Sequence, residues 1–195
     1  MTDSDPRPTV RRQPGKRERL VAAATQLVHQ QGTERTTLAD IATTAGVPVG
    51  NVYYYFKTKD EVIAAVIESH ARLTRAALVS IEADHRSPKD RLKALVREFA
   101  GQSEIIARYG CPLGSLCSEL DKRAPDQGLA VAELMRLPID WAQKQFRSLG
   151  REDARELAFD LLAAYEGSAL LANTMHDSDV LASAARRLDR WIDAL

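Results

Sequence analysis

The amino-acid sequence predicts an all-α protein of about nine helices, with a small three-helix unit first and a larger helical body after it. Three observations support this fold class. Apolar residues recur at helical spacing from Lys16 onwards. Capping residues, prolines and glycines stand where those periodic segments begin and end. No segment has the alternating pattern of a strand, an internal repeat or a biased composition.

The composition fits a small domain joined to a larger one, or one mid-sized domain. The chain has 195 residues, of which 45% are hydrophobic, so it can bury a core. Its 27 basic and 27 acidic residues cancel, so any nucleic-acid contact must come from local charge. A signal peptide and a membrane-spanning apolar run are both absent, and the two cysteines agree with a reducing compartment. We therefore expect a cytoplasmic protein with no membrane partner.

Residues 1–15 are expected to form a flexible basic arm. Six basic residues and one acidic residue lie between positions 7 and 19. Composition alone favours a solvated tail, whereas a nucleic-acid-binding unit directly behind the arm would favour a DNA contact. Both interpretations stay open, and Arg11, Arg12 and Lys16 are the candidates for that contact.

The first helix is predicted from Lys16 to about Gln30, with Gly32 marking its end. Its apolar residues lie on one stripe at helical spacing. This stripe would brace the two short helices that follow, because these are too small to bury their own apolar faces. The stripe consists of Leu20, Ala23, Ala24, Leu27 and Val28.

Two short helices and a tight turn follow. Thr37 is a good N-cap for a helix starting at Leu38, because its hydroxyl can accept from the Asp40 amide while the Asp40 carboxylate reaches back. Gly46 supplies the backbone freedom that a sharp turn needs. Val47 can fill the angle between the two helices.

The second short helix is predicted over residues 49–56. Val52 and Phe56 lie on one face and are expected to pack inward, which leaves three consecutive tyrosines that cannot all be buried. Hydroxyl donors and flat rings suit a phosphate backbone. Thr58 and Glu61 then form a capping box for a third helix. The pattern is a helix-turn-helix, whose second helix would enter a DNA major groove; the alternative is an ordinary helical hairpin with a tyrosine-rich face.

This run closely resembles the DNA-binding domain of TetR-family transcriptional regulators, over about the first third of the chain. Two positions depart from the family pattern: Tyr55 stands where the family often has His, and Val49 where a polar residue is common. The resemblance is carried by Thr37, Asp40-Ile41-Ala42, Ala45-Gly46-Val47, Val52-Tyr53-Tyr54-Tyr55-Phe56, Lys57-Thr58-Lys59 and Glu61.

The resemblance places a DNA-binding domain at residues 16–60. Within it, Tyr53, Tyr54, Thr37 and Lys59 are expected to hold phosphates. Asn51 is a candidate reader of adenine, and Val49 a candidate contact to a thymine methyl. The full predicted DNA-binding set is Arg11, Arg12, Lys16, Thr37, Pro48, Val49, Gly50, Asn51, Tyr53, Tyr54, Tyr55 and Lys59.

Residues 61–195 are predicted to form a helical effector-binding and dimerisation domain. A long amphipathic helix from Lys59 connects it to the DNA-binding domain, and Pro138 is expected to kink a later helix. The periodic segments end at Gly110 and Gly150, among other breaks. The helices are expected at residues 59 to beyond 81, 88 to about 108, 112 to about 122, about 126 to 149, 151 to 175, and from about 179.

The last two helices are unusually apolar. They either pack within the monomer or pair with a second copy in a four-helix bundle, and the resemblance favours the homodimer. It also implies that the body binds a small molecule, of unidentified chemistry, that changes the spacing of the two DNA-binding domains. Candidate lining residues come from several helices and are His70, Phe99, Ser103, Cys117, Met135, Trp141 and Tyr165.

No catalytic, metal-binding or cofactor pattern is present. Cys111 and Cys117 are six residues apart, which is not the spacing of a zinc or redox pair. They are expected to be buried as small hydrophobic residues or, alternatively, to sense thiol-reactive or oxidising compounds. The sequence thus predicts a homodimeric TetR-like repressor, not an enzyme, that an effector releases from a two-fold symmetric DNA operator. The alternatives are a thiol-based regulator and a helical protein-interaction module without DNA binding.

Overall fold

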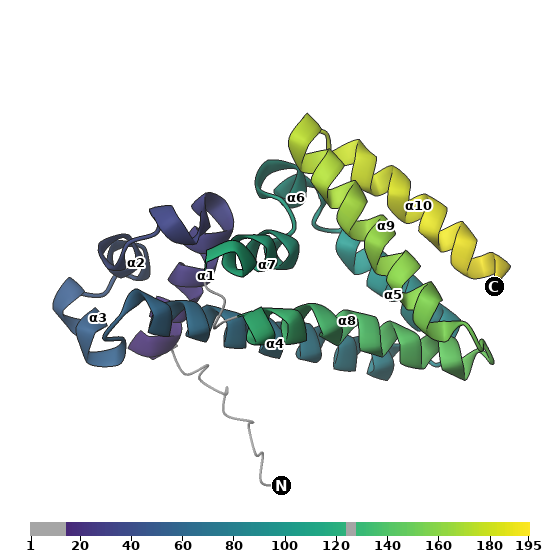
Figure 1. Ribbon diagram of the computed structural model, residues 1–195, viewed down its shortest axis with the longest axis horizontal. Coiled ribbons are helices and arrows are strands. Elements are labelled where there is room, and N and C mark those ends of the chain that lie inside the picture. Colours follow the sequence, from purple (N-terminus) through teal and green to yellow (C-terminus); the bar gives the residue numbers. More distant parts are fainter. Residues whose placement is uncertain (1–14, 124–127) are drawn as a thin grey trace, which may run out of the picture.

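The computed structural model describes residues 15–123 and 128–195, which form ten α-helices and no β-strand. The all-α prediction is confirmed. Figure 1 shows an elongated molecule with the first three helices gathered at one end and the last two helices towards the other. We call the first three helices the head, and the remaining helices the body.

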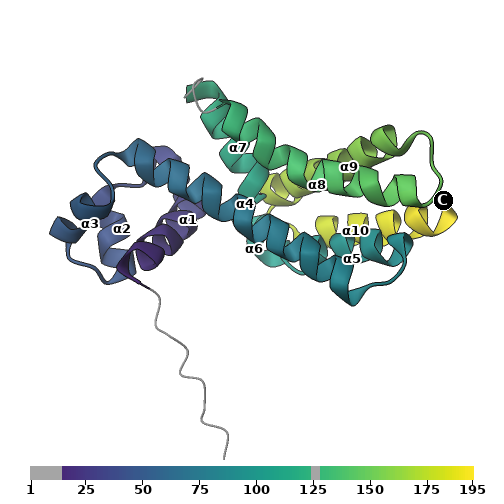
Figure 2. The same cartoon turned by 90° about the horizontal axis from the view of Figure 1, so that it is seen from below.

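The head consists of α1 (Lys16–Arg35), α2 (Leu38–Ala45) and α3 (Val49–Tyr55). α1 is interrupted at Gly32, whose φ of 83° is a left-handed value that a helix interior does not adopt. The predicted end of the first helix is therefore the point where its regular part stops, and one further turn leads to Thr36. α2 crosses α1 and α3 follows it closely, as expected for a helix-turn-helix (Figures 1 and 2).

The long α4 (Lys59–Asp84) runs from the head along the body, as predicted. α8 (Gly128–Ser148) packs against it. α8 continues without a break through Pro138, even though proline cannot donate to the carbonyl of Leu134. α4 therefore joins the head to the body, and α8 lies alongside it (Figure 1).

The segment predicted as one helix from residue 88 is divided into α5 (Pro88–Ala100) and α6 (Ser103–Tyr109). The break falls at Gly101 and Gln102, where the Gln102 amide turns to the Phe99 carbonyl at 3.3 Å. Glycine is a weak helix former, so the apolar spacing that continues past it does not keep the helix intact. The prediction of one continuous helix over this segment is therefore wrong, because it followed the apolar spacing across the break.

The other helices are α7 (Pro112–Arg123), α9 (Ala154–Met175) and α10 (Ser178–Ala194). α9 and α10 form a hairpin whose turn contains His176 in the left-handed region, with φ of 53°. α7 lies between the head and the C-terminal hairpin (Figures 1 and 2). Its position brings a mid-chain helix into contact with α1.

The described residues form two apolar cores. One fills the head and the first half of α4, and it is completed from the body by Leu116 and Leu120 of α7 and by Val131 and Leu134 of α8. The other lies among α4, α5, α8, α9 and α10, around side chains such as Phe146. Because α7 and α8 contribute to the core of the head, any shift of these two helices would change the packing of the head.

Candidate functional site

The turn of the head has the predicted geometry. Thr37 Oγ1 accepts from the Asp40 amide at 3.1 Å, and Asp40 Oδ2 accepts from the Thr37 amide at 3.0 Å, so each residue caps the other. Gly46 ends α2 with φ of 61°, in the left-handed region that favours glycine. Val47 is buried in the angle between the helices. These contacts fix the angle at which α3 leaves the head.

α3 turns one face into the head and the other to solvent. Val52 and Phe56 are buried, as predicted, whereas Tyr53 and Tyr54 expose 51% and 76% of their surface. Tyr55 is half-buried and packs against the core of the head. Asn51 is half-buried, and Pro48, Val49 and Gly50 are exposed at the start of the helix. The outer face of α3 therefore presents aromatic and polar groups that no described part of the chain covers.

Two lysines after α3 are tied to backbone carbonyls. Lys57 Nζ donates to the Tyr53 carbonyl at 2.6 Å, and Lys59 Nζ donates to the Glu34 carbonyl at 3.0 Å. An ammonium has three donors, so Lys59 keeps donors available for an anion while joining α4 to α1. Lys16 is exposed at the start of α1.

The capping box predicted for α4 is only half correct. Thr58 Oγ1 accepts from the Glu61 amide at 3.2 Å, but Glu61 Oε2 accepts from the amide of Lys57, at 2.7 Å, rather than from that of Thr58. The extended backbone at Thr58 places the amide of Lys57 within reach instead. Thr37, by contrast, also donates its hydroxyl proton to Asp40 Oδ2 at 2.6 Å, so a phosphate would have to compete for that proton.

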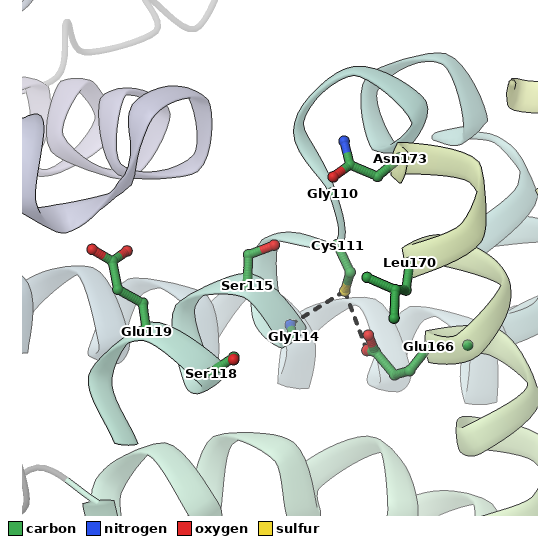
Figure 3. A pocket seen from close by; sticks show the side chains of 10 residues that line it. Gly110, Cys111, Gly114, Ser115, Ser118, Glu119, Glu166, Leu170 and Asn173 are labelled. Carbon is green, nitrogen blue, oxygen red and sulfur yellow. Dashed lines mark hydrogen bonds between the residues drawn. The ribbon is translucent and has the colours of Figure 1, made fainter. Parts of the chain in front are cut away.

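A cavity of about 660 Å³ opens between α7 and α9, close to the end of α1 (Figure 3). Its lining comes from the start and the exposed side of α7 and from the C-terminal half of α9. The lining residues are Gly110, Cys111, Gly114, Ser115, Ser118, Glu119, Glu166, Gly167, Leu170 and Asn173. This volume is in the range of small-molecule sites.

Glu166 and Cys111 meet in the wall of this cavity. Cys111 Sγ donates to Glu166 Oε1 at 3.2 Å and accepts from the Gly114 amide at 3.4 Å, as Figure 3 shows. Burial raises the pKa of Glu166. Burial, followed by the nearby Glu166 carboxylate, raises the pKa of Cys111 to about 12. The site therefore disfavours the thiolate, and it makes the charge on Glu166 costly unless a donor compensates it.

Two other lining residues hold the end of α1. The Glu119 carboxylate accepts from the Thr33 hydroxyl at 2.6 Å and from the amides of Thr33 and Glu34 at 2.9 Å and 3.2 Å. His29 Nε2 lies 2.9 Å from the Gly110 carbonyl, which can only accept, so this nitrogen carries the proton. Glu119 and Gly110 thus line the cavity and also form hydrogen bonds to α1 of the head.

Comparison with known proteins identifies this arrangement. Residues 20–66 match the bacterial regulatory proteins of the tetR family, and residues 88–187 match the C-terminal domain of LmrA/YxaF-like transcriptional regulators. The chain is 37% identical, over 190 residues, to the probable HTH-type transcriptional regulator ArpR of Pseudomonas putida; the match covers 92% of this chain and 90% of that protein. The chain belongs to the TetR family.

Further relatives agree with this assignment. The chain is 26% identical over 193 residues to the HTH-type transcriptional regulator TtgR, also of Pseudomonas putida, and this match covers 92% of this chain and 90% of that protein. A TetR transcriptional regulator from Legionella pneumophila has the same fold, with a TM-score of 0.82 at 22% identity over 91% of this chain and 97% of that chain. This TetR-family protein is a DNA-binding transcriptional regulator and not an enzyme.

Most of the predicted DNA-binding residues of this TetR-family head lie at or beside its outer surface. Lys16, Thr37, Pro48, Val49, Gly50, Tyr53 and Tyr54 are exposed, and Asn51, Tyr55 and Lys59 are half-buried. Arg11 and Arg12 lie outside the described residues, and so does nearly all of the predicted basic arm. The individual DNA contacts stay predictions.

The residues predicted to bind an effector do not meet around one cavity of the TetR-family body. Phe99 stacks on Tyr165 with ring centroids 3.8 Å apart, beside a much smaller apolar void. Cys117 packs on the core of the head, and His70 is buried on α4. Trp141 is buried in the core of the body, and its Nε1 has no hydrogen-bond partner among the described residues. Ser103 and Met135 are half-buried, and the effector role of all seven residues stays a prediction.

The two cysteines are poor candidates for thiol sensing. Burial is the main cause that raises the pKa of Cys117 to about 11, and the pKa of Cys111 is higher still. A sensor needs a depressed thiol pKa and access to solvent. Within the described ranges, the structure also shows no three His, Cys, Asp or Glu side chains grouped to hold a metal, and no helix suited to crossing a membrane.

Sequence reasoning missed Glu119 and Glu166. A signal for Glu166 is present, because a carboxylate interrupts the otherwise small and apolar run from Leu161 to Ala172. Glu119 carries no such signal, since its partners Thr33 and Glu34 are more than eighty residues away in the sequence.

Proposed function

We propose that this TetR-family protein is a homodimeric repressor that binds a two-fold symmetric operator and is released when a small molecule occupies its body. The uncovered outer face of α3 carries the proposal, because no described part of the protein uses its exposed tyrosines. In this proposal α3 enters the major groove and the regulator acts in the cytoplasm, where the chromosome lies.

The proposed roles in the head follow from position and chemistry. Tyr53, Tyr54 and Lys59 hold phosphates and set the register of α3 on the duplex. Asn51 reads a base, because a side-chain amide can pair with both hydrogen-bonding groups on the major-groove edge of adenine. Val49, exposed at the first turn of α3, contacts a thymine methyl.

The proposed dimer uses the C-terminal hairpin. On α9, Phe159, Leu170, Leu171 and Met175 are exposed large apolar residues, and three of the four expose more than half of their surface. Exposed apolar side chains are costly in water, and a second copy related by a two-fold axis would bury Leu171 and Met175, which lie one turn apart on the same face of α9. α10 lies alongside α9 and completes a four-helix bundle.

Effector control is supported by the position of the α7–α9 cavity. Its walls include α9, which belongs to the proposed dimer interface, and Glu119, which holds the end of α1. A straight duplex accepts two recognition helices about 34 to 36 Å apart. A ligand that prefers another spacing of the heads would therefore weaken DNA binding, by its difference in affinity for the two states.

The test is selection of duplexes from a random DNA pool by the purified full chain. A Tyr53→Ala/Lys59→Ala double variant is run beside it, with Lys144→Ala, an exposed lysine of α8, as the control. Lys59 also bonds to the Glu34 carbonyl, so its replacement could loosen the head. Thermal unfolding of each variant is therefore measured to check that the head is still folded.

Enrichment of a two-fold symmetric motif by the parent and the control, but not by the double variant, supports the proposal and supplies the operator. Binding should also fall steeply with salt, because phosphate contacts release counterions. No enrichment at low salt would overturn the proposed repressor and favour a protein-interaction module.

A further inference from the structure

The described side chains that line the α7–α9 cavity carry acidic groups but no basic ones. The described residues that line it include two carboxylates, Glu119 and Glu166, and no lysine or arginine. Its other polar groups are neutral and include Ser115, Ser118 and Asn173. An ionised carboxylate in a cavity with low-dielectric walls favours a positively charged ligand.

Glu166 is the less well compensated of the two carboxylates. Glu119 accepts from three donors of α1, two amides and one hydroxyl, whereas Glu166 accepts a hydrogen bond from the Cys111 thiol, which is a weak donor. Over the part of the chain that is described, no basic side chain pairs with Glu166. Burial raises the pKa of Glu166, and the hydrogen bond from Cys111 opposes this rise as the smaller cause.

The backbone makes room for this carboxylate. Glu166 Oε2 lies against Gly114, in the first turn of α7, and a Cβ atom at that position would overlap with it. Gly114 and the thiol of Cys111 thus hold the carboxylate at the wall of the cavity (Figure 3). Leu170 and Gly167 add an apolar surface on the same side.

We propose that the α7–α9 cavity binds an organic cation, an amine or quaternary ammonium with an apolar group, and that Glu166 is its counter-ion. The inference deepens the proposed function, since it names the chemical class of the effector. The ammonium supplies the charge that Glu166 lacks, and the apolar group lies against Leu170. The volume of about 660 Å³ accommodates a molecule with one or two aromatic rings.

The same site gives the cation a route to the head. With the ammonium at Glu166, the far part of the ligand lies towards Glu119, whose carboxylate holds the end of α1 through Thr33 and Glu34. Gly110, whose carbonyl accepts from His29, lies at the other end of the lining. Occupancy thus acts on two contacts between α1 and the body.

The test uses three probes that share one ring system and differ in charge: 1-naphthylmethylammonium, 1-naphthylmethanol and 1-naphthaleneacetate. Binding to the full chain without DNA is measured by titration calorimetry. Glu166→Gln removes the charge at nearly constant volume, and Glu156→Gln makes the same change on the exposed surface of α9. Thermal unfolding confirms that each variant is folded.

The ammonium should bind the parent protein and Glu156→Gln at least roughly tenfold more tightly than the alcohol, and the carboxylate should bind most weakly. Glu166→Gln should lose roughly tenfold or more in affinity for the ammonium while its affinity for the alcohol stays unchanged. The inference is overturned if the three probes bind equally, or if the ammonium shows no saturable binding at concentrations up to about 1 mM. It is also overturned if Glu166→Gln keeps the parental affinity for the ammonium, or if both variants lose this affinity equally.

The outcome is separate from that of the proposed function, because the titration contains no DNA. Cation binding without operator selection would overturn the proposed repressor function and support the proposed cation site. Operator selection without cation binding would do the reverse. If both hold, the ammonium should also release the operator from the parent protein more readily than from Glu166→Gln.

Discussion

Asn51 and the neighbouring tyrosines differ in the information that they can take from DNA. Tyr53 and Tyr54 are exposed and carry a hydroxyl on a flat ring, which suits phosphates of any sequence. Asn51 carries an amide that can pair with one base edge. In the proposed complex, the two kinds of residue would therefore make separable contributions to affinity and to specificity.

Asn51→Ala should relax the preference at one base position in each half-site and leave binding to other positions unchanged. Losing a specific amide–base pair costs about 1 to 3 kcal/mol at that position. Tyr53→Ala should instead weaken binding to all duplexes alike. The measurement is a competition assay with every single-base variant of the selected operator, and an unchanged base profile for Asn51→Ala would show that this residue does not read a base.

The mutual cap of Thr37 and Asp40 contributes to the stability of the head. Thr37→Ala removes the acceptor for the Asp40 amide and should lower the free energy of unfolding by about 1 kcal/mol. Thr44→Ala, an exposed threonine of the same helix, is the control and should change it little. Urea unfolding measures both variants, and equal effects would assign the loss to the helix in general rather than to the cap.

Cys111 and Cys117 should react slowly with alkylating agents in the folded protein. Their pKa values are raised to about 12 and about 11, so near neutral pH almost all of each thiol is protonated. Iodoacetamide labelling should be much slower than in urea, and the rate should rise as the pH approaches these values. Fast labelling of either cysteine in the native protein at neutral pH would restore the thiol-sensing alternative.

At the scale of elements, α7 connects the head with the cavity. Leu116 and Leu120 pack in the core of the head, while Gly114, Ser115 and Ser118 face the cavity. The side chains on two faces of one helix thus take part in two different sites. A rotation or shift of α7 would change both together, which is the kind of element through which a ligand site can influence a distant surface.

Glu119→Gln should loosen the end of α1. The neutral amide keeps one acceptor oxygen and loses the charge, so the unfolding free energy should fall by roughly 1 to 3 kcal/mol. The amides of Thr33 and Glu34, which donate to Glu119, should exchange hydrogen faster.

The control for this change is Glu98→Gln, an exposed glutamate on α5. Hydrogen exchange followed by mass spectrometry compares the two variants with the parent. If the peptide that contains residues 33 and 34 exchanges at the parental rate in Glu119→Gln, the carboxylate does not hold α1.

At the scale of the whole molecule, α3 lies at one end and the hairpin of α9 and α10 lies towards the other (Figure 1). Pairing of two copies through α9 and α10 would leave both heads free. The spacing of the heads would then depend on how the two bodies sit against each other. The length of α4 and α8, which extend from the head region into the body, transmits that arrangement.

Leu171→Glu with Met175→Glu should convert the proposed dimer to a monomer, because each change places a charge in the apolar interface. The control is Leu73→Glu with Val79→Glu, two apolar residues of α4 that are as exposed as those on α9. Analytical ultracentrifugation gives the mass of each. Dissociation by the α4 changes, and not by the α9 changes, would move the interface to α4.

The local signals in the sequence determined the head. The capping pair at Thr37, the glycine of the turn and the inward pair Val52 and Phe56 act over four residues or fewer, and each was found where it was predicted. The split at Gly101 and the partner of Glu61 were not predicted, because they depend on small differences between competing local hydrogen bonds.

The cavity was decided by tertiary structure alone. It exists because the start of α7 lies beside the C-terminal half of α9, which brings Cys111 to Glu166 across 55 residues of sequence. The same packing brings Glu119 to Thr33 across 86 residues. Helical periodicity tells which face of a helix is buried, but it does not tell against which helix, since any apolar face can cover another. The sequence thus determined the family and the helix-turn-helix head, while the packing of α7 beside α9 decided where the cavity lies.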